Sequence, residues 1–377
     1  MTGSGKKKRS DGDASDRAVH GRATPDGTRR LSSRFRHAFA GDFYRETSMG
    51  LAVSSIGMGT YLGECDDRED ARYARLLATG IAHGLNVLDT AINYRCQRSE
   101  RAVGRALKEA LASGSASRDE IVICTKGGYV PLEGSPPDSR DDYDAYLREQ
   151  YFDRGIMSRE DLVAGGHCLR PRFLADQIDR SRRNLGVECI DLYYLHNPEQ
   201  QLDTLDRARF LSVLREAFAE LESQVAAGRI AAYGCATWHG FRVFAAGRNY
   251  LSLEELLAVA RDVGGSGHHF RAIQLPINLA MTEAVRAPTQ SVDGRHVALL
   301  ALAEEFGVSV FASASLMQAQ LAGNLPDTVR SLFPLDTDAQ RAIAFVRSLP
   351  VATALVGMRS IDHLTENLGA GRAVTQS

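Results

Sequence analysis

The chain has 377 residues, of which 44% are hydrophobic and 24% charged, enough for one large domain or two medium ones. It has no apolar stretch of the roughly 18–20 residues that a membrane helix needs, and its charged start lacks the apolar segment of a signal peptide. The six cysteines form no CxxC pair and no zinc-ligand spacing. We therefore expect a cytoplasmic protein with reduced thiols and no metal site, which excludes secreted, membrane-spanning, disulfide-stapled and fully disordered classes.

The first 45 residues differ from the rest of the chain in charge. They hold eleven Lys and Arg against five Asp, a net charge of +6, whereas the remainder is acidic. Because few large apolar residues precede Leu31, we predict a disordered basic arm over 1–45, a folded domain over 46–372 and a short tail over 373–377. Lys6–Arg9 could bind nucleic acid or an anionic surface, but a solvated tail is the favoured interpretation, and the acidic body argues against a nucleic-acid enzyme.

From residue 50 onward, short apolar runs alternate with segments of helical periodicity. Strands are predicted near 53–58, 86–89, 121–125, 190–195, 230–235, 271–275, 308–312 and 353–356. Helices are predicted near 69–83, 98–112, 172–185, 207–227, 252–263, 295–306, 337–348 and 361–370. Strict alternation of this kind predicts an α/β fold, a (β/α)8 TIM barrel, with long loops over 127–170 and 313–335 at the face where barrel active sites lie.

The glycines at 57, 59 and 63 raise an alternative fold, because their spacing is close to a dinucleotide-binding fingerprint. That fingerprint needs a helix to begin within the glycine run and to face a phosphate. Here the acidic segment 64–70 follows, which would repel phosphate. Tight-turn glycines at the end of a first barrel strand are the better interpretation.

Polar side chains stand at three consecutive strand ends. Asp89 ends the second predicted strand, with Tyr94 five residues on; Lys126 ends the third, and His196 the fourth. Lysine is rare here, with five lysines against forty arginines, so Lys126 indicates a need for a compact ammonium. Singly, these residues could be a helix cap, a half-buried aromatic or a core histidine. Together they predict a catalytic site.

Around these residues the chain resembles the aldo-keto reductase family. The segments VLDTAINYRCQRSERAVGRAL, ICTKGG, IDLYYLHNPE and VGMRSIDHLTENLGA are similar to four of that family's motifs, in the same order, within 50–372. The resemblance implies a tetrad of Asp89, Tyr94, Lys126 and His196, NADP(H) as cofactor and a small carbonyl or alcohol as substrate. It implies reduction with Tyr94 as general acid/base, activated because Lys126 lowers its pKa and Asp89 holds Lys126, while His196 orients the carbonyl.

The resemblance also implies a set of cofactor-binding residues. These are Thr60, Tyr61, Asp89, Thr237, Gln274, Ser313, Leu316, Gly357, Arg359, Ser360, His363, Glu366 and Asn367. Arg359 would bind a 2′-phosphate and so favour NADPH over NADH. Two departures affect nicotinamide binding: Ala236 and Thr237 replace the usual Ser-Asn, and Ser313 replaces a stacking aromatic, which leaves Trp238 as the candidate aromatic.

These departures keep two other functions open. One is a lyase or dehydratase that uses Tyr94 and Lys126 for proton transfer. The other is a non-catalytic, cofactor-sensing barrel subunit. The aromatic residues of 127–170 suit either a bulky ligand or packing against the barrel. They are Tyr129, Tyr143, Tyr146, Tyr151 and Phe152.

Overall fold

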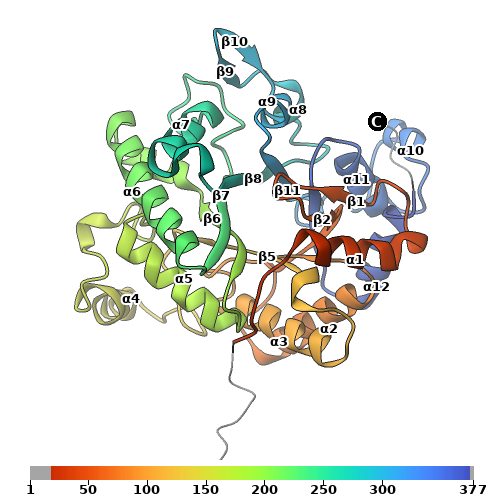
Figure 1. Cartoon of the computed structure of the whole chain (residues 1–377), viewed down its shortest axis with the longest axis horizontal. Coiled ribbons are helices and arrows are strands. Elements are labelled where there is room, and N and C mark those ends of the chain that lie inside the picture. Colours follow the sequence, from red (N-terminus) through yellow and green to blue (C-terminus); the bar gives the residue numbers. More distant parts are fainter. Residues whose placement is uncertain (1–17, 374–377) are drawn as a thin grey trace, which may run out of the picture.

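The computed structural model describes residues 18–373 and confirms the barrel (Figure 1). Eight parallel strands close in the order β11-β12-β3-β4-β5-β6-β7-β8, with β8 pairing to β11. Their bounds are β3 Ile56–Gly59, β4 Val87–Asp89, β5 Val122–Gly127, β6 Ile190–His196, β7 Ile230–Ala236, β8 Phe270–Pro276, β11 Ser309–Ser313 and β12 Thr353–Gly357. Each is a predicted strand to within a few residues, because strands buried on both faces read as continuous apolar runs.

Helices surround these strands, and Figure 1 shows them on the outside of the barrel. They are α2 Asp67–Ala82, α3 Arg98–Ala112, α5 Pro171–Leu185, α6 Arg207–Ala226, α7 Leu253–Gly264, α9 Leu299–Glu305, α11 Asp338–Arg347 and α12 Ile361–Ala370. Several begin at a polar N-cap: Asp66, Asp206 and Ser252 each accept a hydrogen bond from the backbone N–H three residues on. The predicted helices are confirmed, except that α9 is shorter than 295–306.

The long connections carry structure of their own. The segment 127–170 contains α4 Arg140–Leu147, the π-helix η4 Arg148–Phe152 and the 3-10 turn η5 Arg159–Asp161. Tyr151 packs with Leu147 and Phe173 in a small separate core, and Tyr143, Tyr146 and Phe152 pack against it. Most aromatics of this segment therefore serve packing. The loop 313–335 contains α10 Asp327–Leu332, and the unpredicted segment after β8 contains α8 Glu283–Arg286 and the hairpin β9 Gln290–Val292 with β10 Arg295–Val297.

The predicted disordered arm is wrong for the part that the structure describes. Helix α1 Pro25–Phe35, the turn η2 Arg36–Ala38 and strand β1 Tyr44–Glu46 occupy it, and β1 pairs with β2 Ala52–Ser54. Helix α1 packs on β2 and on the turn η3 Arg118–Glu120, at the amino-terminal ends of the strands (Figure 1).

Two kinds of contact hold α1 in place. Leu31 is fully buried in the main core, and Arg30 and Arg34 both pair with the buried carboxylate of Glu120. The arginines that make this segment basic thus form ion pairs with a carboxylate of the barrel, and their number does not indicate disorder. Lys6–Arg9 lie outside the described residues.

We expect Leu31→Ala to lower the free energy of unfolding by about 2–4 kcal/mol, because it empties a site that is 0% exposed. Leu332→Ala is the matched control, since Leu332 is 73% exposed and should change stability by less than about 0.5 kcal/mol. Chemical denaturation of both variants measures the difference. Equal stability of the two variants would show that α1 is not docked in solution.

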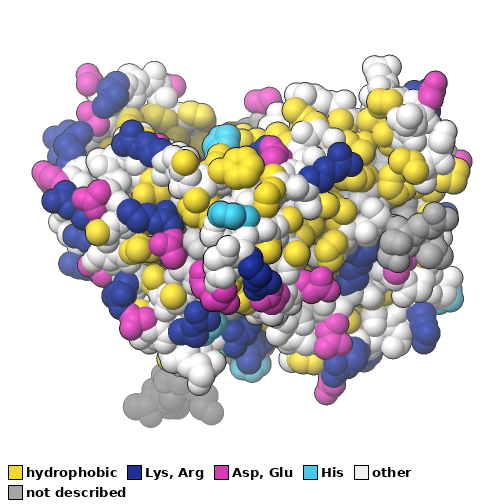
Figure 2. Space-filling view, turned by 90° about the horizontal axis from the view of Figure 1, so that it is seen from above, with side chains coloured by type: hydrophobic (Ala, Val, Ile, Leu, Met, Phe, Trp, Pro, Cys, Tyr) yellow, Lys and Arg dark blue, Asp and Glu magenta, His cyan; other side chains and the backbone are white. Residues whose placement is uncertain are grey.

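The described surface is mixed in charge. In the face shown in Figure 2, basic and acidic side chains are interspersed, and hydrophobic side chains gather toward one side. Within residues 18–373, none of the helices has the length and apolar character required to cross a membrane.

Candidate active site

A buried ion pair lies at the carboxyl ends of β4 and β5. The Nζ of Lys126 donates to Asp89 Oδ1 at 2.5 Å and to the carbonyl oxygen of Thr90 at 2.8 Å. Lys126 is only 1% exposed. Burial lowers the pKa of Lys126, but the charge of the Asp89 carboxylate and its hydrogen bond oppose burial, and the net effect is a raised pKa. Lys126 is therefore an ammonium at neutral pH.

Asp89 also links β4 to its neighbour β3 and to β8 across the barrel. Its second oxygen, Oδ2, accepts from Gln274 Nε2 at 2.8 Å, and its carbonyl oxygen accepts from Thr60 Oγ1 at 3.1 Å. Gln274 lies on β8 and Thr60 directly follows β3. The Asp89 carboxylate is thus oriented by Lys126 and Gln274, and Thr60 holds the Asp89 backbone.

Tyr94 lies above this pair in the loop between β4 and α3. Lys126 Nζ is 5.0 Å from the centroid of the Tyr94 ring, and the rings of His196 and Tyr61 have centroids 5.8 and 5.1 Å from it. The structure therefore brings the four predicted catalytic residues together. Burial raises the pKa of Tyr94, and the charge of Lys126 opposes this without cancelling it. The predicted net lowering is wrong, because desolvation of the phenolate outweighs the ammonium, and Tyr94 keeps its proton at neutral pH.

His196 faces Tyr94 at the end of β6. Burial lowers the pKa of His196 well below its usual value, and the Lys126 ammonium lowers it further. The imidazole is therefore neutral at pH 7. Its Nδ1 is buried and has no hydrogen-bond partner among the described residues.

A second histidine, His167, holds the backbone of His196 by a hydrogen bond. His167, from the long segment after β5, places Nε2 2.8 Å from the carbonyl oxygen of His196 and Nδ1 2.7 Å from Gln201 Nε2. Because a carbonyl can only accept, Nε2 carries the proton and Nδ1 accepts from Gln201. The ring of Tyr129 lies between the two histidines, with centroids 4.9 Å from His167 and 5.0 Å from His196.

The loop after β7 is held by a buried carboxylate. Glu199 Oε1 accepts from the backbone N–H groups of Trp238, His239 and Gly240, at 2.8, 3.0 and 3.2 Å. Thr237 Oγ1 is buried without a partner among the described residues, and Trp238 is 41% exposed. Ser313, the last residue of β11, is half-buried, and Leu316 in the following loop packs against the core.

The carboxyl-terminal segment forms a helix start beside this face. Ser360 caps α12, since its Oγ accepts from the N–H of His363 at 3.1 Å. Gly357, Arg359 and His363 are exposed, Glu366 is half-buried and Asn367 is buried. Arg359 is not free: its guanidinium lies 3.6 Å from the Glu69 carboxylate, at the first turn of α2.

Comparison with known proteins assigns this barrel to a family. The model of the Aldo/keto reductase family matches residues 55–246, which include the whole of β3 to β7. The chain belongs to the aldo-keto reductase family. Solved aldo-keto reductases share the fold over 89% of this chain: one from Bacillus halodurans in its holo form, with a TM-score of 0.60, 21% identity and 92% of its own chain covered, and one from Klebsiella pneumoniae in complex with NADP and acetate, with a TM-score of 0.58, 21% identity and 92% covered.

Curated relatives of this aldo-keto reductase align with only part of the chain. The chain is 28% identical to the 6-dehydroglucose reductase of Novosphingobium aromaticivorans over 49% of this chain and 48% of that protein. It is 28% identical to the NADH-specific methylglyoxal reductase of Escherichia coli over 55% and 52%. It is 31% identical to the D-threo-aldose 1-dehydrogenase of a Pseudomonas species over 49% and 50%. The alignments thus span about half the length of these relatives.

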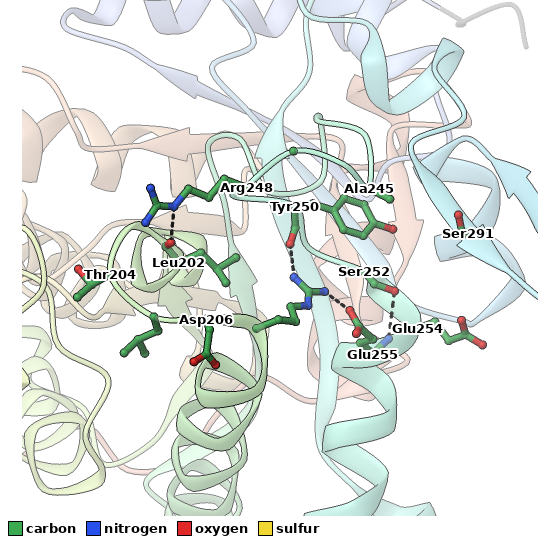
Figure 3. Close-up of a pocket in the computed structure, with 13 residues that line it drawn as sticks. Leu202, Thr204, Asp206, Ala245, Arg248, Tyr250, Ser252, Glu254, Glu255 and Ser291 are labelled. Carbon is green, nitrogen blue, oxygen red and sulfur yellow. Dashed lines mark hydrogen bonds and ion pairs between the residues drawn. The ribbon is translucent and has the colours of Figure 1, made fainter.

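A separate hollow of about 880 Å³ lies between the loops after β6 and β7 (Figure 3). Its two arginines are already engaged: Arg207 donates to the carbonyl of Tyr250 at 2.5 Å and pairs with Glu255, and Arg248 donates to the carbonyl of Leu202 at 2.9 Å. None of the predicted site residues lines this hollow. We therefore place the candidate active site of the reductase at the strand ends.

Three residues that position the site were not predicted from the sequence, namely His167, Gln201 and Glu199. A signal for Glu199 exists, because an acid follows the His-Asn-Pro turn directly. His167 carries no such signal, since it lies forty-one residues after Lys126 in a loop with no regular pattern. Within residues 18–373, no cluster of three or more His, Cys, Asp or Glu side chains is arranged to hold a metal.

Because His167 is buried, we predict that the free energy of unfolding depends on pH. Burial lowers the pKa of His167 to about 4, against about 6.5 in an unfolded chain. Between these values the unfolded state binds the proton that the folded state excludes. The stability that this histidine supports is therefore complete above about pH 6.5 and is lost as the pH falls toward 4.

We expect His167→Gln, which has no titrating ring but can still donate to His196, to lack this dependence. The stability advantage of the native protein over the variant should shrink by about 1–3 kcal/mol between pH 7 and pH 4.5. Chemical denaturation at the two pH values measures it. A constant difference would contradict the buried, neutral state of His167.

Proposed function

We propose that the protein interconverts a small carbonyl compound and its alcohol with a nicotinamide cofactor, preferentially NADP(H). The observation that carries the proposal is the buried Asp89–Lys126 pair beneath Tyr94, with the ring of His196 beside that of Tyr94. Carbonyl reduction requires a proton at the oxygen as negative charge develops there. This arrangement supplies a proton donor and a neutral hydrogen-bond donor at one point.

Each side chain has a distinct role in this proposal. Tyr94, whose pKa is raised by burial, is protonated and gives its proton to the developing alkoxide. Lys126 stabilises the resulting phenolate, which makes the transfer favourable at the moment of reaction. Asp89 keeps Lys126 charged and fixed, and acts through it. His196, being neutral, donates to the carbonyl oxygen and orients it.

The residues at the barrel mouth fit a nicotinamide cofactor. Thr237 Oγ1, Asn93 Oδ1 and Thr90 Oγ1 are buried polar atoms that lack partners within the described chain, as expected of groups that bind a ligand. Gln274, Ser313 and Trp238 would contact the nicotinamide side. The bound cofactor supplies the hydride that no side chain can provide. Thr60, Tyr61 and Leu316 complete that side.

The carboxyl-terminal segment would hold the adenosine side. Gly357 ends β12, and Ser360 and His363 lie at the start of α12, whose N–H groups suit a phosphate. Glu366 and Asn367, farther along α12, would contact the adenine. Arg359 would bind the 2′-phosphate, but the Glu69 carboxylate 3.6 Å away competes for it. The preference for NADPH over NADH is therefore expected to be modest. Fluorescence titration with both cofactors measures it.

Tyr94→Phe tests the proposed role of the phenol. Only one hydroxyl is lost, so the fold and NADPH binding should be unchanged, whereas turnover of an aldehyde, followed by NADPH absorbance at 340 nm, should fall roughly 10²–10⁴-fold. Retained turnover within threefold would show that Tyr94 is not the proton donor. Absence of NADPH and NADH binding to the unaltered protein would contradict the proposed function itself.

A further inference from the structure

Two of the six cysteines meet beside the candidate active site. The sulfur of Cys65, in the loop after β3, lies 3.7 Å from the sulfur of Cys96, in the loop after β4. Cys65 is half-exposed and Cys96 is buried. They are thirty-one residues apart in sequence and show none of the spacing that marks a cysteine pair.

The backbone around these sulfurs is held so that they remain adjacent. Arg95 donates to the carbonyl of Glu64 at 2.7 Å and to Asp70 Oδ1 at 2.6 Å, while Arg98 donates to Asp70 Oδ2 at 2.6 Å. Arg95 and Arg98, which flank Cys96, thus bridge the loop after β4 to the segment that contains Cys65. The two thiols face each other because of these bridges and need no refolding to approach.

The backbone of the loop after β4 is also conformationally constrained. Arg95, Cys96 and Gln97 have φ values of 48°, 54° and 70°, in the left-handed region that side-chain-bearing residues rarely occupy. Tyr94 directly precedes this stretch, and its ring contacts that of Tyr61, four residues before Cys65. Any change in the separation of the two sulfurs therefore acts on the loop that positions Tyr94.

We propose that Cys65 and Cys96 form a reversible disulfide under attack by a hydroperoxide, and that this bond switches the active site off. The formation of the bond stands on the sulfur contact alone. Its effect on turnover rests on the proposed function of Tyr94. A sulfur–sulfur bond is about 2.05 Å long, so the sulfurs must approach by about 1.6 Å.

The chemistry needs only an external peroxide. The accessible Cys65 thiol gives up its proton and its sulfur attacks the peroxide. The O–O bond breaks, Cys65 becomes a sulfenic acid, and the departing hydroxide takes up the Cys65 proton to form water. The Cys96 sulfur then attacks the Cys65 sulfur, the S–O bond breaks, and the Cys96 proton leaves with the hydroxide as a second water. Two thiols have lost two electrons and two protons, and one hydrogen peroxide has become two waters. A dithiol reverses the reaction by exchange.

This order of events follows from the environments of the two thiols. Burial and the neighbouring Cys65 raise the pKa of Cys96 to about 12. Cys96 therefore stays a protonated thiol until Cys65 has been oxidised. The half-exposed Cys65 is the group that a peroxide in solvent can reach.

Peptide mapping of the full chain tests whether the bond forms. The protein is treated with hydrogen peroxide, blocked with N-ethylmaleimide and digested with trypsin. We expect peptide 46–68 joined to peptide 96–98, two hydrogens lighter than their sum and absent after dithiothreitol. Cys65→Ser should abolish this species, and Cys189→Ser, a buried cysteine elsewhere, should retain it. Separate blocking or separate oxidation of Cys65 and Cys96, with no joined peptide, would overturn the proposal.

Turnover measured on the same samples tests the switch. We expect peroxide to lower aldehyde reduction at least about tenfold, since a displacement near 1 Å at a reacting group can cost about 10²-fold, and dithiothreitol to restore it. Cys65→Ser should keep its activity in peroxide. A joined peptide with unchanged turnover would overturn the switch. If the reduced protein shows no reductase activity, the proposed function fails, whereas peptide mapping still decides whether the disulfide forms.

Discussion

The arrangement of the barrel mouth depends on one buried ion pair. Removing a carboxylate and an ammonium from water costs several kcal/mol for each ion, so a lysine that is 1% exposed is stable only beside a fixed counter-charge. Asp89 is fixed by Gln274 and Thr60, and Lys126 by Asp89 and the Thr90 carbonyl. Four of the eight strands are thereby tied to one point at their carboxyl ends, namely β3, β4, β5 and β8.

The loops around this point are fixed by single buried polar groups. His167 anchors the long segment after β5 to the backbone of His196, and Glu199 gathers three N–H groups of the loop after β7. Arg95 holds the loop after β3 against the loop that bears Tyr94. Unsatisfied buried polar groups are costly, so each anchor makes one loop position strongly preferred. Two buried polar atoms at this face, Thr237 Oγ1 and Asn93 Oδ1, lack a hydrogen-bond partner within the described chain.

The fold was predictable from sequence because each barrel strand is buried on both faces, which leaves a continuous apolar run such as IVICT beside an amphipathic helix. The meeting of Asp89, Lys126 and His196 was predictable because parallel strands bring their carboxyl ends to one face, and Tyr94 follows Asp89 by five residues. Helix α1 was missed because composition alone does not show that Arg30 and Arg34 meet Glu120. The pKa of Tyr94 was misjudged because burial, which exceeds the effect of Lys126, is a property of the fold. His167 and the Cys65–Cys96 contact join distant segments without a motif.

The central claim is that a compact ammonium at position 126 controls the Tyr94 proton, and the pH dependence of alcohol oxidation in Lys126 variants tests it most directly. Oxidation needs the phenolate, so its rate rises through the pKa of Tyr94. Lys126→Met removes the charge that lowers this pKa, and should shift the acidic limb to higher pH. Lys126→Arg keeps a charge in a bulkier, planar group, and should still bind NADPH but lose about 10²-fold in turnover. Unchanged turnover and an unchanged pH profile in Lys126→Arg would contradict the account.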